Sequence, residues 1–342
     1  MSNVEFGCLP TIIGSMPHTD PEAACAQITR YLKDIPAWPQ LPKRSFLENM
    51  YVQYSQGFPG IVVESGSLYV NRQPDLDTPL EQLYAAYLAN DIDKYAIRPN
   101  YAAGLASFLS MENLSPLAAK GQLIGPVSWA MVVSDYDRQL VVYDDTLVDA
   151  AAKLLRLKAG WQEKQLRKIS KNTIIFVDEP YMVSFGSGYV QLSKEKVIEL
   201  LEEVLGGISG LKGIHCCGNT DWSVLLNTSV DIISFDAYNY AQSLSLYPED
   251  INKLLERNGA IAWGIIPNNE ESLAKETVAS LQDRLEEAMA PFTRDGVRFK
   301  QLIEQGLLTP SCGLGSMASP EAAEQVLKLL AELSAKIRQR YL

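Results

Sequence analysis

Residues 173–180, TIIFVDEP, decide how the rest of the chain is interpreted. The run opens with β-branched and apolar residues and ends in two acids and a proline. A helical pattern precedes it at 144–170, and another follows it at 193–208. A short apolar strand between two helices is typical of a parallel sheet that is covered on both faces. The stretch therefore predicts an α/β protein.

Seven more runs of this kind occur along the chain, and each ends in a polar or glycine-bearing turn. Eight strands that alternate with helices match the number that closes into a (β/α)8 TIM barrel. We therefore predict a single barrel domain over residues 1–342, with a doubly wound open sheet as the alternative. No Gly-x-Gly-x-x-Gly turn follows an early strand, which argues against a dinucleotide-binding sheet. The other runs are TIIGS (11–15), GIVVES (60–65), GQLIGP (121–126), LKGIHCCG (211–218), DIISFDAY (231–238), AIAWGIIP (260–267) and GLLTPSCGLG (306–315).

Helical spacing also fills the segments 248–259, 270–292 and 319–342. Ser193 and Ser319 stand where N-capping residues are expected. Two segments interrupt the alternation and are predicted to be loop or helical insertions near the barrel mouth, namely 35–50, which is rich in proline, and 66–120.

Composition excludes several classes of function. The 342 residues are 47% hydrophobic and 21% charged, with a net charge of −11 and no basic run. Nucleic-acid binding, which needs such a run, is not expected. No stretch of about 18 apolar residues and no secretory signal occurs, so no membrane association is expected. Five irregularly spaced cysteines fit a reducing compartment, and a cytoplasmic location is predicted.

The residue types that bind metals gather at predicted strand ends, which is where chemistry occurs in barrels. His215 and Cys217 point to the same side of an extended strand, whereas Cys216 points to the other. Cys312 and Asp236 follow two other predicted strands.

Imidazole nitrogen and thiolate sulfur together favour zinc, with an oxygen of Asp236 available to complete a tetrahedron. The alternative is that these cysteines are buried core residues or hold a structural metal.

Five short runs carry a resemblance to a known family: IIGSMP near the start, then VDEP, HCCGNT, ISFD and SCGLG. Together they resemble the catalytic barrel of cobalamin-independent methionine synthase, in a short form without that family's N-terminal barrel. Relatives in the uroporphyrinogen decarboxylase superfamily include zinc methyltransferases that act on coenzyme M. The resemblance implies that His215, Cys217 and Cys312 are zinc ligands. Asp236 matches an acidic ligand that is glutamate in the methionine synthases.

The resemblance also implies the activity of an S-methyltransferase that converts a small thiol, homocysteine, into the thioether methionine. Asp178 matches the carboxylate that holds the homocysteine amino group, and the turn of Ile13, Gly14 and Ser15 matches the backbone that meets its carboxylate. His18 is a candidate for a catalytic role or a substrate contact. The alternative for His18 is a solvent-facing loop histidine, with Thr19 and Asp20 capping the next helix.

The methyl donor is predicted from what the chain lacks. Folate-using methionine synthases place a catalytic histidine in a late Asp-Ile-His-Ser-like turn, whereas residues 264–272 read GIIPNNEES. A methylcorrinoid on a partner protein is therefore favoured over methylfolate, because it needs less acid catalysis. The alternatives are a methyltransferase of the coenzyme M type and a barrel with a structural metal and no thiol methylation. A metal-free porphyrin decarboxylase is disfavoured, since arginine clusters near the first strand are missing.

Overall fold

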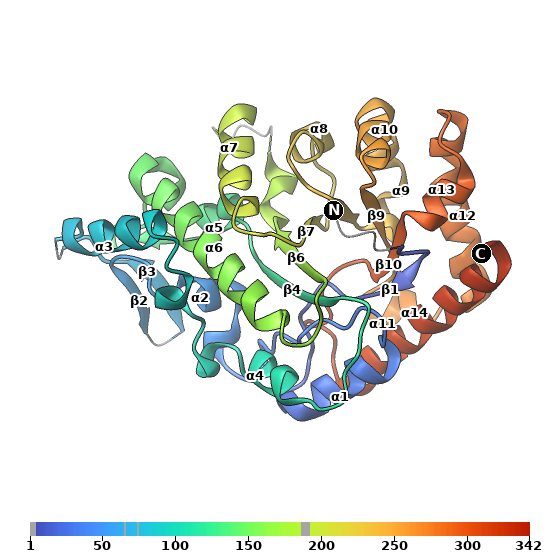
Figure 1. Cartoon of the computed structure of the whole chain (residues 1–342), viewed down its shortest axis with the longest axis horizontal. Coiled ribbons are helices and arrows are strands. Elements are labelled where there is room, and N and C mark those ends of the chain that lie inside the picture. The colour runs from blue at the N-terminus through green and yellow to red at the C-terminus, as the bar shows by residue number, and fades with distance from the viewer. Residues whose placement is uncertain (1–4, 65, 74, 186–191) are drawn as a thin grey trace.

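The computed structural model describes residues 5–64, 66–73, 75–185 and 192–342. Within these residues the main sheet contains seven parallel strands, in the order β1, β10, β9, β8, β7, β6, β4. The sheet curls, and helices cover its outer face (Figure 1). Its strands are β1 (Leu9–Pro10), β4 (Ala119–Ile124), β6 (Thr173–Asp178), β7 (Leu211–Cys216), β8 (Ile232–Phe235), β9 (Ala260–Ile266) and β10 (Gly306–Pro310).

The segment 34–40 lies between β1 and β4, the two edges of this sheet. On the β1 side, the Gln40 N–H donates to the Gly14 carbonyl at 3.0 Å. On the β4 side, the Lys120 N–H donates to the Pro36 carbonyl at 3.0 Å. The segment therefore takes the place of an eighth strand, although its prolines lack the N–H groups of a regular ladder. The predicted (β/α)8 barrel fold is confirmed.

The apolar run 60–65, predicted from the sequence to be the second barrel strand, belongs to another sheet. β2 (Ile61–Glu64) pairs antiparallel with β3 (Ser67–Val70), and β3 pairs parallel with β5 (Ser134–Asp135). The β-branched pattern correctly predicts a strand, but it does not specify the partner strand. The barrel position is filled instead by the beginning of the segment 35–50, which was predicted to be a loop.

The outer helices begin where the sequence provides caps. The Ser193 hydroxyl accepts the Lys196 N–H at the start of α7, and the Ser319 hydroxyl accepts the Ala322 N–H at the start of α14, as predicted. The α-helices are α1 (Pro21–Tyr31), α2 (Met50–Ser55), α3 (Asp77–Leu88), α4 (Ala103–Ser110), α5 (Pro126–Val132), α6 (Asp145–Leu166), α7 (Lys194–Leu205), α8 (Trp222–Leu226), α9 (Ala237–Ser245), α10 (Pro248–Glu256), α11 (Glu270–Leu273), α12 (Val278–Arg294), α13 (Phe299–Glu304) and α14 (Pro320–Tyr341). Short 3-10 helices are η1 (Phe46–Glu48), η2 (Ile92–Tyr95), η3 (Pro99–Tyr101), η4 (Val141–Tyr143) and η5 (Pro180–Ser184).

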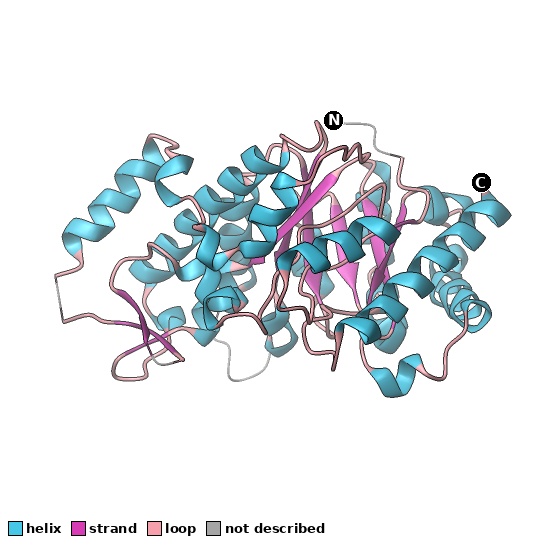
Figure 2. Cartoon of the chain, turned by 90° about the horizontal axis from the view of Figure 1, so that it is seen from below, coloured by secondary structure: helices cyan, strands magenta, loops and turns pink. Residues whose placement is uncertain are grey.

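The elements inserted between segment 34–40 and β4 pack against the side of the barrel. Figure 2 shows the small sheet, formed by β2 and β3 of this insertion with β5, which follows β4, apart from the main one. Phe58, Val70 and Leu83 of this insertion belong to the same hydrophobic cluster as Leu155 of α6. The insertion therefore shares a core with the barrel helices.

The two longest described helices, α6 and α14, span 22 residues each and carry charged residues along their length. Among the described helices, none is both long enough and apolar enough to cross a bilayer. The cytoplasmic location stays a prediction.

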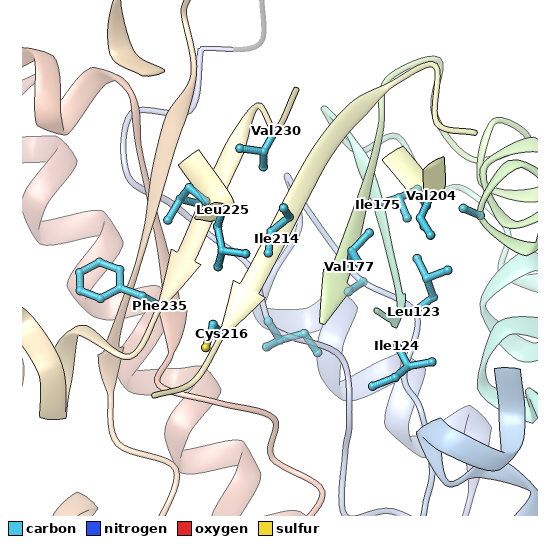
Figure 3. Packing of buried hydrophobic residues seen from close by; sticks show 14 of the residues in the cluster. Leu123, Ile124, Ile175, Val177, Val204, Ile214, Cys216, Leu225, Val230 and Phe235 are labelled. Atoms are coloured by element: carbon cyan, nitrogen blue, oxygen red, sulfur yellow. The ribbon is translucent and has the colours of Figure 1, made fainter. Parts of the chain in front are cut away.

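Alternation along the strands separates an outer layer from the barrel interior. Ile214 and Cys216 of β7 pack with Leu225 and Phe235 between the sheet and the helices (Figure 3). Cys216 is therefore a packing residue, as its position in the strand predicts. His215, between these two residues, faces the barrel interior.

Candidate metal centre

His215 lies on the inner face of β7, close to the end of the strand. It pairs in register with Asp178 of β6 on one side and with Ser234 of β8 on the other. The Ser234 hydroxyl lies 2.9 Å from Nδ1 of His215. The other ring nitrogen, Nε2, is buried and has no hydrogen-bond partner among the described residues. Leaving a buried polar atom without a partner is costly, so Nε2 is suited to bind a ligand that the chain itself does not supply.

The sulfur atoms of Cys217 and Cys312 form one cluster with the His215 imidazole. Their Sγ atoms and a ring nitrogen of His215 all lie within 4.8 Å of one another. Cys217 comes one residue after β7, and Cys312 comes two residues after β10, so two non-adjacent strands supply the ligands. No other group of three or more His, Cys, Asp or Glu side chains with this spacing occurs in the part of the chain that the structure describes. The cluster can hold a metal ion.

The two thiols share an environment that favours one thiolate. The hydrogen bond with Cys312 lowers the pKa of Cys217, and His215 lowers it further. The same hydrogen bond, together with burial, raises the pKa of Cys312. Before a metal binds, the pair therefore holds a single proton at neutral pH. Since the thiolate is the form of cysteine that binds metals, one ligand is already in its binding form.

Asp236, the fourth predicted ligand, lies at the end of β8 but outside this cluster. Its Oδ1 accepts the Asn239 N–H at 2.8 Å, and its Oδ2 accepts the Asn239 side-chain amide at 2.7 Å. Oδ1 therefore caps α9, while Oδ2 is bonded to the Asn239 side chain. Ligation by Asp236 stays a prediction.

The two acids of the VDEP run have different surroundings. Glu179 is fully buried and accepts the N–H groups of Val127 at 3.0 Å and Ser128 at 2.7 Å, so it holds the start of α5. Asp178 faces the barrel interior beside His215, and its Oδ1 is buried without a partner among the described residues. Burial raises the pKa of Asp178 to about 7, while neighbouring positive charges oppose this rise. Asp178 is therefore the acid that remains available to a ligand.

Two side chains of β4, Lys120 and Gln122, contact the turn of Ile13, Gly14 and Ser15. The Lys120 ammonium donates to the Ile13 carbonyl at 2.7 Å. A Cβ at Gly14 would lie 2.3 Å from Cδ of Gln122, so only glycine fits there. Within the described residues, the N–H groups of Gly14 and Ser15 donate to no acceptor. Two adjacent free N–H groups of this kind can bind an anionic group.

His18 lies among the outer helices. Its imidazole is buried and lines a surface crevice of about 490 Å³ with Asp20, Gln27 and Glu321. Burial lowers the pKa of His18, and the charged neighbours that act on it belong to this crevice. Oδ1 of Asp20 accepts the Glu22 N–H and caps α1, as the alternative interpretation expects, but that interpretation is wrong in making the His18 ring solvent-facing, because the ring is buried. A catalytic role for His18 stays a prediction.

Three residues of the site were not predicted from the sequence. Ser234 fixes the His215 ring, and Lys120 supports the turn of Ile13, Gly14 and Ser15. Tyr51 of α2 lies within electrostatic reach of Cys217 and Asp178. A lysine in the short strand AKGQLI is a usable sequence signal, because a buried lysine needs a partner. Ser234 and Tyr51 carry no such signal.

The fold and the donor cluster together describe the chain that is compared here with proteins of known structure. It is a (β/α)8 barrel with one imidazole and two thiols at the carboxyl ends of its strands. The chain is similar to a methyltransferase from Methanosarcina mazei, with a TM-score of 0.55 over 97% of this chain and 95% of that chain, at 13% identity. This likeness shows a shared fold.

The chain is also similar to a B12-independent methionine synthase from Shewanella sp. W3-18-1, solved in complex with selenomethionine. The TM-score is 0.46 at 19% identity, over 65% of this chain and 63% of that chain. The chain thus spans less than two thirds of the length of that enzyme. No protein-family model and no curated protein sequence matches the chain. The predicted resemblance to this group of methyltransferases is confirmed as a similarity of fold, through the match to the Methanosarcina mazei methyltransferase.

Proposed function

We propose that this protein is a zinc-dependent S-methyltransferase that methylates a small thiol, homocysteine, to the thioether methionine. The observation that carries the proposal is the convergence of His215, Cys217 and Cys312, with the buried Nε2 of His215 free to bind. A zinc ion held there would lower the pKa of a coordinating substrate thiol and so supply the nucleophilic thiolate.

The donor set supports a catalytic rather than a structural zinc site. One imidazole and two thiolates are ligands that zinc prefers. Structural zinc sites use four protein ligands, whereas catalytic sites use three and leave a position for substrate. Three donors lie together here, and both oxygens of Asp236 are engaged by Asn239. The substrate thiol takes the position that these three ligands leave open.

The polar groups around the cluster support an amino-acid thiol as the acceptor. Asp178, beside His215, offers a carboxylate oxygen without a partner to the substrate ammonium. The free N–H groups of Gly14 and Ser15 receive the substrate carboxylate. Coenzyme M carries a sulfonate and no amino group, so Asp178 favours homocysteine over coenzyme M.

The donor side of the site supports a methylcorrinoid rather than methylfolate. The chain contains only two histidines. His215 belongs to the metal cluster, and His18 lies in the crevice between α1 and α14. In the transfer, a bond forms between the thiolate sulfur and the methyl carbon, and the bond to the donor breaks with its electron pair left on the donor. A corrinoid leaving group needs no proton, which fits a site without a spare histidine.

Metal analysis and a methyl-transfer assay test the proposal together. Protein prepared without added zinc should contain one zinc per chain and should form methionine from homocysteine faster with methylcobalamin than with methylfolate. Cys312→Ser should lose zinc and activity. Cys25→Ala, which changes a buried cysteine beneath α4, should retain both. Zinc-free wild-type protein, or equal activity in the two variants, would contradict the proposal.

A further inference from the structure

The ligand Cys312 lies in a loop, residues 311–315, which we call the Cys312 loop. The loop begins directly after β10, where the pairing with β9 shifts register between Thr309 and Pro310. Its backbone is held from outside. The Ser311 N–H donates to the Ile266 carbonyl at 2.8 Å, and the Leu314 N–H donates to the Ser15 carbonyl at 2.9 Å. The position of the sulfur therefore depends on contacts with neighbouring segments.

Asn268 makes the contacts closest to the sulfur. It follows the end of β9, separated from the strand only by Pro267. The Ser311 hydroxyl donates to Oδ1 of Asn268 at 3.1 Å, and Nδ2 of Asn268 donates to the Gly313 carbonyl at 3.2 Å. One amide thus bonds to the residue before Cys312 and to the residue after it.

Close packing against Ser15 restricts the conformation of the loop. A Cβ at Gly313 would lie 2.2 Å from the hydroxyl oxygen of Ser15, so the loop is pressed against the first strand end. Ser15 also accepts the Gly315 N–H at 3.2 Å. The loop is therefore held between Ser15 on one side and Asn268 on the other.

We propose that Asn268 is a positioning residue of the metal centre, whose amide holds the sulfur of Cys312 within ligand distance of His215 and Cys217. The inference rests on metal binding at the proposed site. Residues that orient metal ligands typically contribute about 10–100-fold to metal affinity.

The chemistry of the amide predicts an order among variants. Asn268→Ala loses both hydrogen bonds. Asn268→Asp keeps the acceptor for Ser311 but turns a carboxylate oxygen toward the Gly313 carbonyl, where two acceptors repel. Both variants should bind zinc at least tenfold more weakly. Ser311→Ala loses one hydrogen bond and should weaken zinc binding less. The double variant Asn268→Ala, Ser311→Ala should bind zinc about as weakly as Asn268→Ala alone, because the two residues share one hydrogen-bond network.

The test is zinc affinity measured by competition with a chromophoric chelator, together with the absorption spectrum of the Co(II)-loaded protein. Asn269→Ala is the matched control, because the neighbouring Asn269 caps α11 through the Ser272 N–H. We expect Asn268→Ala to weaken zinc binding and to shift the Co(II) thiolate bands, while the melting temperature of the metal-free protein stays unchanged. Asn269→Ala should match the wild type in affinity and spectrum.

Three outcomes overturn the inference. The first is a zinc affinity of Asn268→Ala equal to that of the wild type, and the second is an equal loss of zinc affinity in Asn268→Ala and Asn269→Ala. The third is a loss of zinc affinity that parallels a lower melting temperature of the metal-free protein, with the Co(II) bands unchanged. If the wild-type chain itself binds no zinc, the proposed function fails first. If the wild type binds zinc and Asn268→Ala binds it equally well, the inference fails alone.

Discussion

Zinc binding should release close to one proton per chain between pH 7.5 and 8.5. The hydrogen bond with Cys312 lowers the pKa of Cys217, which is therefore already a thiolate, while the pKa of Cys312 is raised. Only the Cys312 proton must leave on binding, since both sulfurs bind as thiolates. The apparent association constant should therefore rise about tenfold per pH unit, which corresponds to about 1.4 kcal/mol. Two independent protonated thiols would give about a hundredfold.

Isothermal titration in two buffers of different ionisation enthalpy counts the released protons directly. Cys312→Ser removes one sulfur ligand together with the thiol hydrogen bond that lowers the pKa of Cys217, so its zinc affinity should be lower. Cys25→Ala should behave as the wild type, because Cys25 lies outside the cluster. A release of two protons by the wild type, or an association constant that rises about a hundredfold per pH unit, would refute the shared-proton account of the cluster.

Three further predictions concern the groups around the cluster. Lys120→Met removes the donor to the Ile13 carbonyl and should raise the KM for homocysteine about tenfold, with the zinc content unchanged. Lys158→Met is the control, because it changes an equally buried lysine on α6 and should leave this KM unchanged. Equal KM values in the two variants would contradict the role of Lys120. Burial lowers the pKa of Lys158 to about 7, so the unfolded chain binds more protons than the folded chain between pH 7 and about 10.5. The free energy of unfolding therefore rises with pH in this range. Lys158→Met should reduce the rise between pH 7 and pH 9, measured by urea unfolding, by about 2 kcal/mol. Ser234→Ala leaves Nδ1 of His215 without its partner and should weaken zinc binding about 10–100-fold in a chelator competition, and unchanged affinity would show that the ring is held by packing alone.

Most of the barrel could be predicted because buried parallel strands have a plain sequence pattern. Runs such as 174–177 and 260–266 are apolar throughout, and each lies in a strand where the pattern predicts one. The exception is the second barrel position. Segment 34–40 contains Pro36 and Pro39, which lack N–H groups, so it pairs irregularly and has no strand pattern. The β-branched run 60–65 has that pattern but pairs elsewhere.

The ligands could be predicted because parallel strands end at the same edge of the barrel. Residues far apart in sequence, such as His215 and Cys312, must then approach one another. The groups that orient them depend on details that one sequence does not contain. Ser234 reaches His215 because of the register between β7 and β8, and Asn268 reaches the Cys312 loop only through a bent connection after β9.

The position of Asp236 shows the same limit. Its place at a strand end is what the sequence predicts, but its side chain also suits a helix cap, and both oxygens bond to Asn239. An aspartate after a strand and before a helix satisfies either role, and the pattern does not distinguish them.

The most direct test of the account is zinc X-ray absorption of the loaded protein with and without homocysteine. We predict two sulfur ligands with nitrogen or oxygen neighbours in the free protein, and a third sulfur at bonding distance, with one lighter ligand lost, after homocysteine is added. An unchanged set of ligands in the presence of saturating homocysteine, or a site with no sulfur ligands, would contradict the claim that this barrel activates a thiol on its metal.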